Sequence, residues 1–217
     1  MEQNEEEHIE YKMDIGEHYQ PSQLVFVDES SFNHMTMWRP FAWSQRGDCA
    51  RCREFFVRGA RCVCNVFLTT QLIFGRYSIL PALSLDGILH VEVLNHAIDG
   101  ANFLSFVEGL LERMQPWPLP NSVLIMDNAT IHRVNGVQEM VEAHGSRLVY
   151  LPAYSPDLNP IKEAFSSIKA WLRANRDYVL GEIEGDDVDP YRVIWEAVHS
   201  VTPEDAYGWF QHCEYIA

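Results

Sequence analysis

The sequence has 217 residues, 47% of them hydrophobic and 22% charged, and its 16 Lys and Arg against 31 Asp and Glu give a formal net charge of −15. This composition is typical of a globular domain with a substantial core, and it excludes collagen-like, disordered and disulfide-stapled chains. No apolar run approaches the roughly 20 residues that span a bilayer, and the start, MEQNEEEHIEYK, lacks the basic flank and apolar core of a signal peptide. We therefore expect an intracellular protein with no membrane partner.

The excess of acid lies at the two ends of the chain. Residues 1–20 carry a net charge of −6, residues 177–217 carry −9, and the middle is neutral. Within the middle, residues 39–61 have a local charge of +4, which suits a polyphosphate such as DNA. A solvated hairpin with ordinary surface arginines is the alternative. The candidate DNA-binding residues are Arg39, Arg46, Arg51, Arg53, Arg58 and Arg61.

The cysteine count, five, is odd and favours reduced thiols. Cys49-x2-Cys52 followed by Cys62-x-Cys64 raises a zinc site, because four thiolates suit a tetrahedral shell. The spacing is irregular, however, and strand alternation would place Cys62 and Cys64 on one face as small core residues.

The first half of the chain alternates as strands do. Residues 23–30, QLVFVDES, predict a buried strand that ends in carboxylates, and residues 54–70 predict two more strands. The following strands are expected to break at Pro81 and at Asp86-Gly87, which is a hairpin signal. The first half is therefore predicted to be an antiparallel meander.

The second half switches to alternating helices and strands. Residues 99–114 have a helical apolar stripe, residues 121–128 form a second buried strand, and a helix closed by Gly145 precedes a short strand. This succession implies parallel strands joined by right-handed crossovers. Further helices are predicted from Pro160 and after the N-cap Thr202.

Asp28 and Asp127 occupy matching places, because each ends a strongly apolar strand, VFVD and VLIMD. If the strands are neighbours, the two carboxylates converge at one edge of the sheet, where open α/β sheets place their sites. Close carboxylates need a cation or a shared proton, and magnesium suits this arrangement since it leaves positions for water and phosphate oxygens. The alternative is two aspartates that cap separate loops.

Three sequence motifs follow one another along the chain: VFVDES, LIMDNATIH and LPAYSPDLNPIKEAFSSIKAWL. Together they resemble the catalytic core of mariner-type and related insertion-sequence transposases, in the DDE transposase and retroviral-integrase superfamily. The likeness spans about residues 22–176, and VTPEDAYGWF resembles the tail of fungal members.

The resemblance implies an α/β, ribonuclease H-like fold: a mixed sheet with antiparallel first strands and then parallel strands, flanked by helices and followed by C-terminal helices. It also implies two Mg²⁺ or Mn²⁺ ions held by three carboxylates, which activate water or a DNA 3′-hydroxyl and stabilise the leaving oxygen. The first two acids fall on Asp28 and Asp127. Asn128 and His132 match the supporting polar residues that follow. For His132 the alternative is a ring that caps a helix or is hydrogen-bonded within the core. DNA as partner, a homodimer on paired DNA ends and a nuclear location in a eukaryote follow from the same resemblance.

The third acid of the resemblance is absent from its place. Family members read Asn-Pro-Ile-Glu, with 34 residues between the second Asp and that Glu, and the same count from Asp127 lands on Lys162. Glu163 is the neighbouring substitute, but one helical step of about 100° would turn it away. Alternatively, Lys162 pairs with Asp28 and Asp127 and supplies the charge that a metal would supply.

We therefore predict an acidic arm at 1–20, either frayed or a short edge element, a DDE catalytic domain at 21–176 and an acidic helical extension at 177–217. Full-length relatives carry N-terminal helix-turn-helix modules, so this chain is either an excised catalytic domain or a remnant without them. The expected function is that of a transposase catalytic domain with impaired catalysis. The alternatives are a domesticated interaction module and a ribonuclease or resolvase-like nuclease on the same fold.

Overall fold

The computed structural model describes residues 5–32, 77–134, 136–175, 178–179 and 189–216. Within these ranges the chain forms one mixed sheet of six strands. Strand β3 pairs antiparallel with β1, β2 and β4, whereas β1–β5 and β5–β6 are parallel. This is the predicted order of antiparallel and then parallel strands. The strands are β1 (Leu24–Val27), β2 (Ser30–Phe32), β3 (Tyr77–Ser84), β4 (Gly87–Leu94), β5 (Val123–Met126) and β6 (Arg147–Tyr150).

Strands β1 and β2 follow β3 in one continuous register, with a break at Asp28 and Glu29. Continuing that register places Pro81 opposite Asp28, and proline has no N–H to contribute to a ladder. The sequence predicted that Pro81 would end a strand, and this is wrong, because β3 runs through it and pairs with β4 there. The break lies instead in the strand opposite, and it frees two acidic residues from the ladder. The predicted hairpin at Asp86-Gly87 is confirmed.

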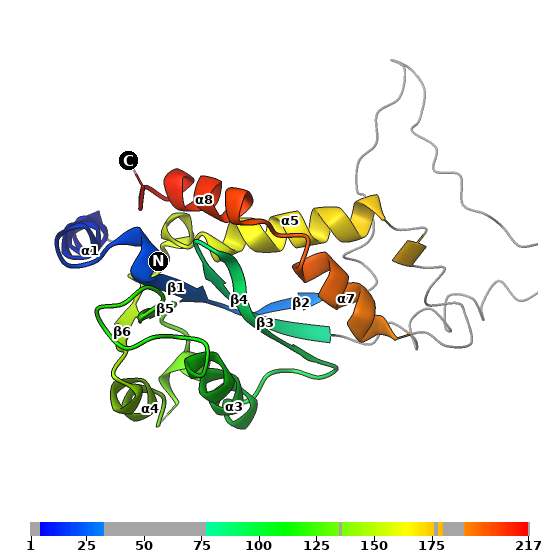
Figure 1. Cartoon of the computed structure of the whole chain (residues 1–217), viewed down its shortest axis with the longest axis horizontal. Coiled ribbons are helices and arrows are strands. Elements are labelled where there is room, and N and C mark those ends of the chain that lie inside the picture. Colours follow the sequence, from blue (N-terminus) through cyan, green and yellow to red (C-terminus); the bar gives the residue numbers. More distant parts are fainter. Residues whose placement is uncertain (1–4, 33–76, 135, 176–177, 180–188, 217) are drawn as a thin grey trace, which may run out of the picture.

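Helices cover both faces of the sheet (Figure 1). Helices α3 and α4 lie on one face, and α5, α7 and α8 lie on the other. None of the described helices is long and apolar enough to cross a membrane. The helices are α1 (Glu5–His18), α3 (Gly100–Leu111), α4 (Val137–His144), α5 (Ile161–Ala174), α7 (Pro190–Val198) and α8 (Pro203–His212), with short 3₁₀ turns η1 (Pro21–Gln23), η3 (Thr130–Arg133) and η4 (Pro156–Leu158).

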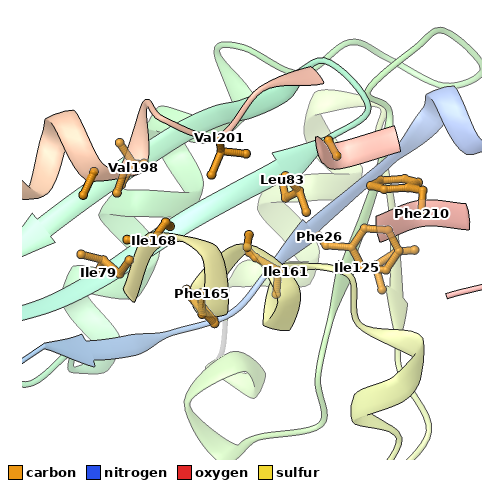
Figure 2. Packing of buried hydrophobic residues seen from close by; sticks show 14 of the residues in the cluster. Phe26, Ile79, Leu83, Ile125, Ile161, Phe165, Ile168, Val198, Val201 and Phe210 are labelled. Carbon is orange, nitrogen blue, oxygen red and sulfur yellow. The ribbon is translucent and has the colours of Figure 1, made fainter. Parts of the chain in front are cut away.

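The central strands are apolar on both faces because each face has its own core. Along β1, Phe26 belongs to the cluster under α5, α7 and α8, whereas its neighbour Val27 belongs to the cluster under α3 and α4. Figure 2 shows Phe26 and Ile125 of the sheet gathered with Ile161 of α5 and Phe210 of α8. This double burial explains why VFV and VLIM are unbroken apolar runs.

The N-terminal segment differs from its prediction. Instead of a frayed arm or an edge element, residues Glu5–His18 form helix α1, which buries Tyr11 and Ile15 in the same cluster as Phe26. Three glutamates in its first turn suit the positive end of the helix dipole. At the other end of the chain, the predicted N-cap Thr202 is confirmed, and it forms a reciprocal capping box with Asp205. The division of the chain at residues 20 and 176 stays a prediction.

Candidate active site

The two strand-end aspartates come from neighbouring strands. In the parallel pair of β1 and β5, Val27 lies opposite Met126, so Asp28 and Asp127 each follow a register-matched residue. The expectation that the two strands are adjacent is therefore confirmed. Their carboxyl ends form the edge of the sheet from which both acidic side chains emerge.

Asp28 is almost fully buried, with 2% of its surface exposed. Side chains alternate along a strand, so a residue after Val27 is expected on the face covered by α5. There its Oδ2 accepts a hydrogen bond from Asn159 Nδ2 at 3.0 Å and pairs with the Lys162 ammonium. Its Oδ1 accepts from the Glu29 backbone N–H at 2.8 Å. Burial raises the pKa of Asp28, while the hydrogen bond and charge of Lys162 oppose that rise.

Lys162 stands in the first turn of α5 and reaches back to Asp28. Its side chain is 43% exposed, and its ammonium lies 6.0 Å from the centre of the Phe165 ring. Glu163, one residue later, points its carboxylate to helix α8, where Oε1 lies 3.4 Å from His212 Nδ1. The side chains of Lys162 and Glu163 therefore contact different parts of the molecule, as expected from the rotation of about 100° between successive residues of a helix.

Asp127 and Glu29 are joined through one imidazole. His132 Nδ1 lies 2.6 Å from Asp127 Oδ1, and Nε2 lies 2.9 Å from Glu29 Oε2. The His132 side chain is fully buried against the Phe103 ring, 4.9 Å between ring centres. Because only a doubly protonated ring can donate to both carboxylates, this geometry calls for imidazolium. Although burial opposes the charge, the hydrogen bonds to Asp127 and Glu29 raise the pKa of His132 to about 10.

The same contacts act on the two acids. The hydrogen bond from His132 lowers the pKa of Glu29 and that of Asp127, against the opposing effect of burial. Asp127 also accepts the Ala129 backbone N–H at 3.0 Å, and Tyr150 donates to the His132 carbonyl at 3.3 Å. The acidic cluster therefore contains three carboxylates and two protein cations.

Sequence reasoning brought together Asp28, Asp127, His132 and Lys162, but it missed Glu29 and Asn159. The sequence has no signal for Glu29, because the break opposite Pro81 is visible only in the strand register. Asn159 stands directly before Pro160, where α5 begins, but its contact with Asp28 is not indicated by that position. The supporting residue Asn128 follows Asp127 with its side chain exposed. The six candidate DNA-binding arginines, the four candidate zinc-binding cysteines and the two strands predicted at 54–70 lie outside the described residues.

The arrangement does not fit a two-magnesium centre. Magnesium is bound by free carboxylate oxygens and water, whereas Asp28, Glu29 and Asp127 are each engaged by donors of the protein itself. In the part of the chain that the structure describes, no group of three or more His, Cys, Asp or Glu is placed to hold a metal ion. Lys162, at the position where the resemblance implies the third acid, is the residue that pairs with Asp28.

The mixed sheet, the helices on both faces and the acids at the carboxyl ends of β1 and β5 define a ribonuclease H-like domain. Residues 23–179 match the model of the DDE superfamily endonuclease family, and the chain belongs to that family.

Solved structures of the Mos1 transposase share the fold. The Mos1 paired-end complex with left transposon end has a TM-score of 0.57 at 18% identity, over 98% of this chain and 64% of that one. The Mos1 catalytic domain with raltegravir and Mg has a TM-score of 0.52 at 16% identity, over 98% of both chains. The paired-end complex with Mn has a TM-score of 0.55 at 18% identity, over 95% of this chain and 62% of that one. This chain thus has the fold of a mariner transposase catalytic domain and spans 64% of the Mos1 chain in the first complex.

Proposed function

We propose that the chain is a mariner-type transposase catalytic domain, descended from enzymes that cut and join DNA, in which Lys162 suppresses the metal-dependent reaction. The observation that carries the proposal is the direct ion pair between Lys162 and the buried Asp28. The adjacency of Asp28 and Asp127 supports the descent, and the ammonium in the third acidic position supports the loss of activity.

The electrostatic reason is the difference between an ammonium and a metal ion. Lys162 places a positive charge directly on Asp28, and its hydrogen bond and charge oppose the rise that burial causes in the pKa of that carboxyl. An ammonium, however, offers only hydrogen-bond donors, with no open coordination position for water or a phosphate oxygen. The charge of the Asp28 carboxylate is therefore balanced, but the site gains no position at which water or a phosphate could be activated. We further propose that Glu163 is no substitute, since its carboxylate faces His212.

DNA is the proposed substrate and partner. One of the similar Mos1 structures is a paired-end complex with the left transposon end, and others are paired-end complexes with Mg or Mn, which are the ions we propose for the lineage. We propose that the six arginines between residues 39 and 61 contact DNA and that paired ends are held by a homodimer, in the nucleus if the source is a eukaryote. With a net charge of −15, the affinity for DNA should be weak and fall steeply with salt.

The test is nicking of supercoiled plasmid in Mg²⁺ or Mn²⁺ by the unaltered chain and by K162E. We expect background activity from the unaltered chain and metal-dependent nicking by K162E, because that variant supplies the third carboxylate. R173E makes the same change of charge near the end of α5 and should stay at background. Equal nicking by the unaltered chain and K162E would contradict the proposal.

A second candidate function is a domesticated interaction module. Its support is the same neutralised site together with half-exposed aromatic rings on the C-terminal helices: Trp195 is 47% exposed and Tyr207 is 50% exposed. Phe210, another aromatic residue of α8, is fully buried. Failure of K162E to bind metal or nick DNA, with an intact fold, would favour this second function.

A further inference from the structure

The two ends of the chain are fastened together next to the candidate site. Helix α1 lies at the same end of the molecule as the segment after α8 (Figure 1). Lys12 Nζ lies 2.6 Å from Glu214 Oε2, and the hydroxyl oxygens of Tyr11 and Tyr215 are 3.2 Å apart. His8 Nε2 also contacts Asp157 of the η4 turn at 2.9 Å. We call this set of contacts the terminal clasp.

Tyr215 is the centre of the clasp. Its ring packs on Phe26 of β1, with 5.1 Å between ring centres, and on Phe210 of α8 at 6.0 Å. Its hydroxyl donates to the Leu158 carbonyl at 2.7 Å. A phenol has one hydrogen to donate, so Tyr11 must be the donor in the contact between the two hydroxyls. The tyrosine pair thus forms a directed chain that ends on the backbone of η4.

The Leu158 carbonyl belongs to the peptide bond that carries Asn159. The Asn159 side chain donates to Asp28, and the Asn159 carbonyl accepts the Lys162 backbone N–H at 3.0 Å. Both groups that contact Asp28 Oδ2 therefore depend on the position of this one residue. Holding the Leu158–Asn159 peptide in place holds the Asn159 amide and the start of α5 together.

Asn159 needs this external support. Its side chain is buried, and its Oδ1 has no hydrogen-bond partner among the described residues. The orientation of the amide is consequently fixed by the backbone and by the single bond to Asp28. An anchor on the preceding carbonyl is the contact best placed to supply that fixation.

We propose that Tyr215 is a positioning residue of the candidate site, which acts through Leu158 and Asn159 on Asp28. The inference rests on the proposed function in treating Asp28 as a site residue. It adds that a tyrosine near the C-terminus, held by the N-terminal helix, sets the geometry around that carboxylate.

The first test uses ¹⁵N NMR of the full chain, with hydrogen exchange of the Asn159 side-chain NH₂ as the readout and an N159D sample to assign the signal. Y215F removes only the hydroxyl and should speed this exchange about fivefold, the value of one hydrogen bond. Y11F should have a smaller effect, because it leaves the bond to Leu158. Y207F, the same change at a half-exposed tyrosine of α8, should have none.

Thermal melting measured by circular dichroism accompanies each variant and shows that it is folded at the temperature of the exchange measurement. Unchanged Asn159 exchange in a folded Y215F protein would overturn the proposal, even if its melting temperature falls, because a purely structural role predicts that pattern.

A second test separates this inference from the proposed function. In the K162E background, Y215F should weaken manganese binding severalfold, and Y207F should leave it unchanged. Equal manganese affinity in K162E and Y215F/K162E would count against the positioning role. If K162E itself binds no manganese, the proposed function fails, while the exchange experiment still decides the role of Tyr215.

Discussion

The candidate site neutralises its acids in two different ways. On the α5 side, the buried Asp28 is paired with Lys162, whose side chain is 43% exposed. On the α3 side, the arrangement is reversed: the cation His132 is fully buried, and its partners Asp127 and Glu29 are 39% and 38% exposed. Losing a partner costs a buried group more than a half-exposed group, which can bind water instead. Removing the buried group itself has a further cost, because His132 carries two ion pairs and its packing against Phe103, whereas Lys162 carries one ion pair. The two halves of the site should therefore respond differently to mutation.

The largest effect is expected from removing His132. H132Q removes a buried cation that binds two carboxylates and should lower the free energy of unfolding by about 2 to 3 kcal/mol. This is less than the roughly 3 to 5 kcal/mol of a broken, fully buried pair, because water can reach both acids. Urea unfolding measures it. H199A, at an exposed ring stacked on Trp195, is the control and should cost far less. If H132Q lowers the free energy of unfolding no more than H199A does, the His132 imidazolium does not stabilise the fold through its two carboxylates.

Removing Lys162 should have the next largest effect. K162M keeps the aliphatic stem but leaves the buried Asp28 carboxylate with only its neutral donors, at a cost of about 1 to 2 kcal/mol. A double-mutant cycle with D28N isolates the pair, because K162M should cost much less when residue 28 is uncharged. Additive costs in the cycle would mean that the ion pair contributes nothing to stability.

Glu163 offers a contrast within the same helical turn. Its pair with His212 joins side chains that are 42% and 74% exposed, so E163Q should change the free energy of unfolding by no more than about 0.5 kcal/mol. The same substitution should leave nicking by K162E unchanged. If E163Q abolishes nicking by K162E, then Glu163 belongs to the reaction centre after all.

The last prediction concerns the reactivity of Cys213, near Glu163, and involves no change in the site itself. Burial, with added repulsion from nearby acids led by Glu163, raises the pKa of the Cys213 thiol to about 11. The thiol should stay protonated until the pH approaches that value, so its alkylation by iodoacetamide at pH 8 should be at least about 100-fold slower than that of an exposed cysteine peptide. Peptide mass spectrometry follows the rate, and rapid modification of the folded chain at pH 8 would contradict the burial of this group.

Much of the sheet could be predicted because strands that are buried on both faces have unbroken apolar sequences. The runs before Asp28 and Asp127 are apolar throughout, since both faces of β1 and β5 are covered, and the two acids mark where those strands end. The resemblance to the family placed Lys162 at the third acidic position, and a pair with Asp28 and Asp127 was one of the alternatives that this allowed; the structure shows the pair with Asp28. These features depend on local pattern and on the resemblance to the family.

The parts that could not be predicted depend on contacts between distant segments. Helix α1 is acidic and weakly patterned, and Tyr11 and Ile15 find their core only when the C-terminal segment lies beside them. Glu29 meets its partner 103 positions away, and Asn159 meets Asp28 across 131 positions. The local sequence around these residues does not indicate such pairs, because their hydrogen bonds form only after the strands and helices have assembled.

The most direct test of the account is a manganese titration of the unaltered chain and of K162E by calorimetry. The account predicts no saturable binding to the unaltered chain, because its own ammonium occupies the Asp28 carboxylate, and saturable binding to K162E that D127N removes. Saturable binding of manganese to the unaltered chain, lost in D28N, would contradict the claim that Lys162 takes the place of the metal.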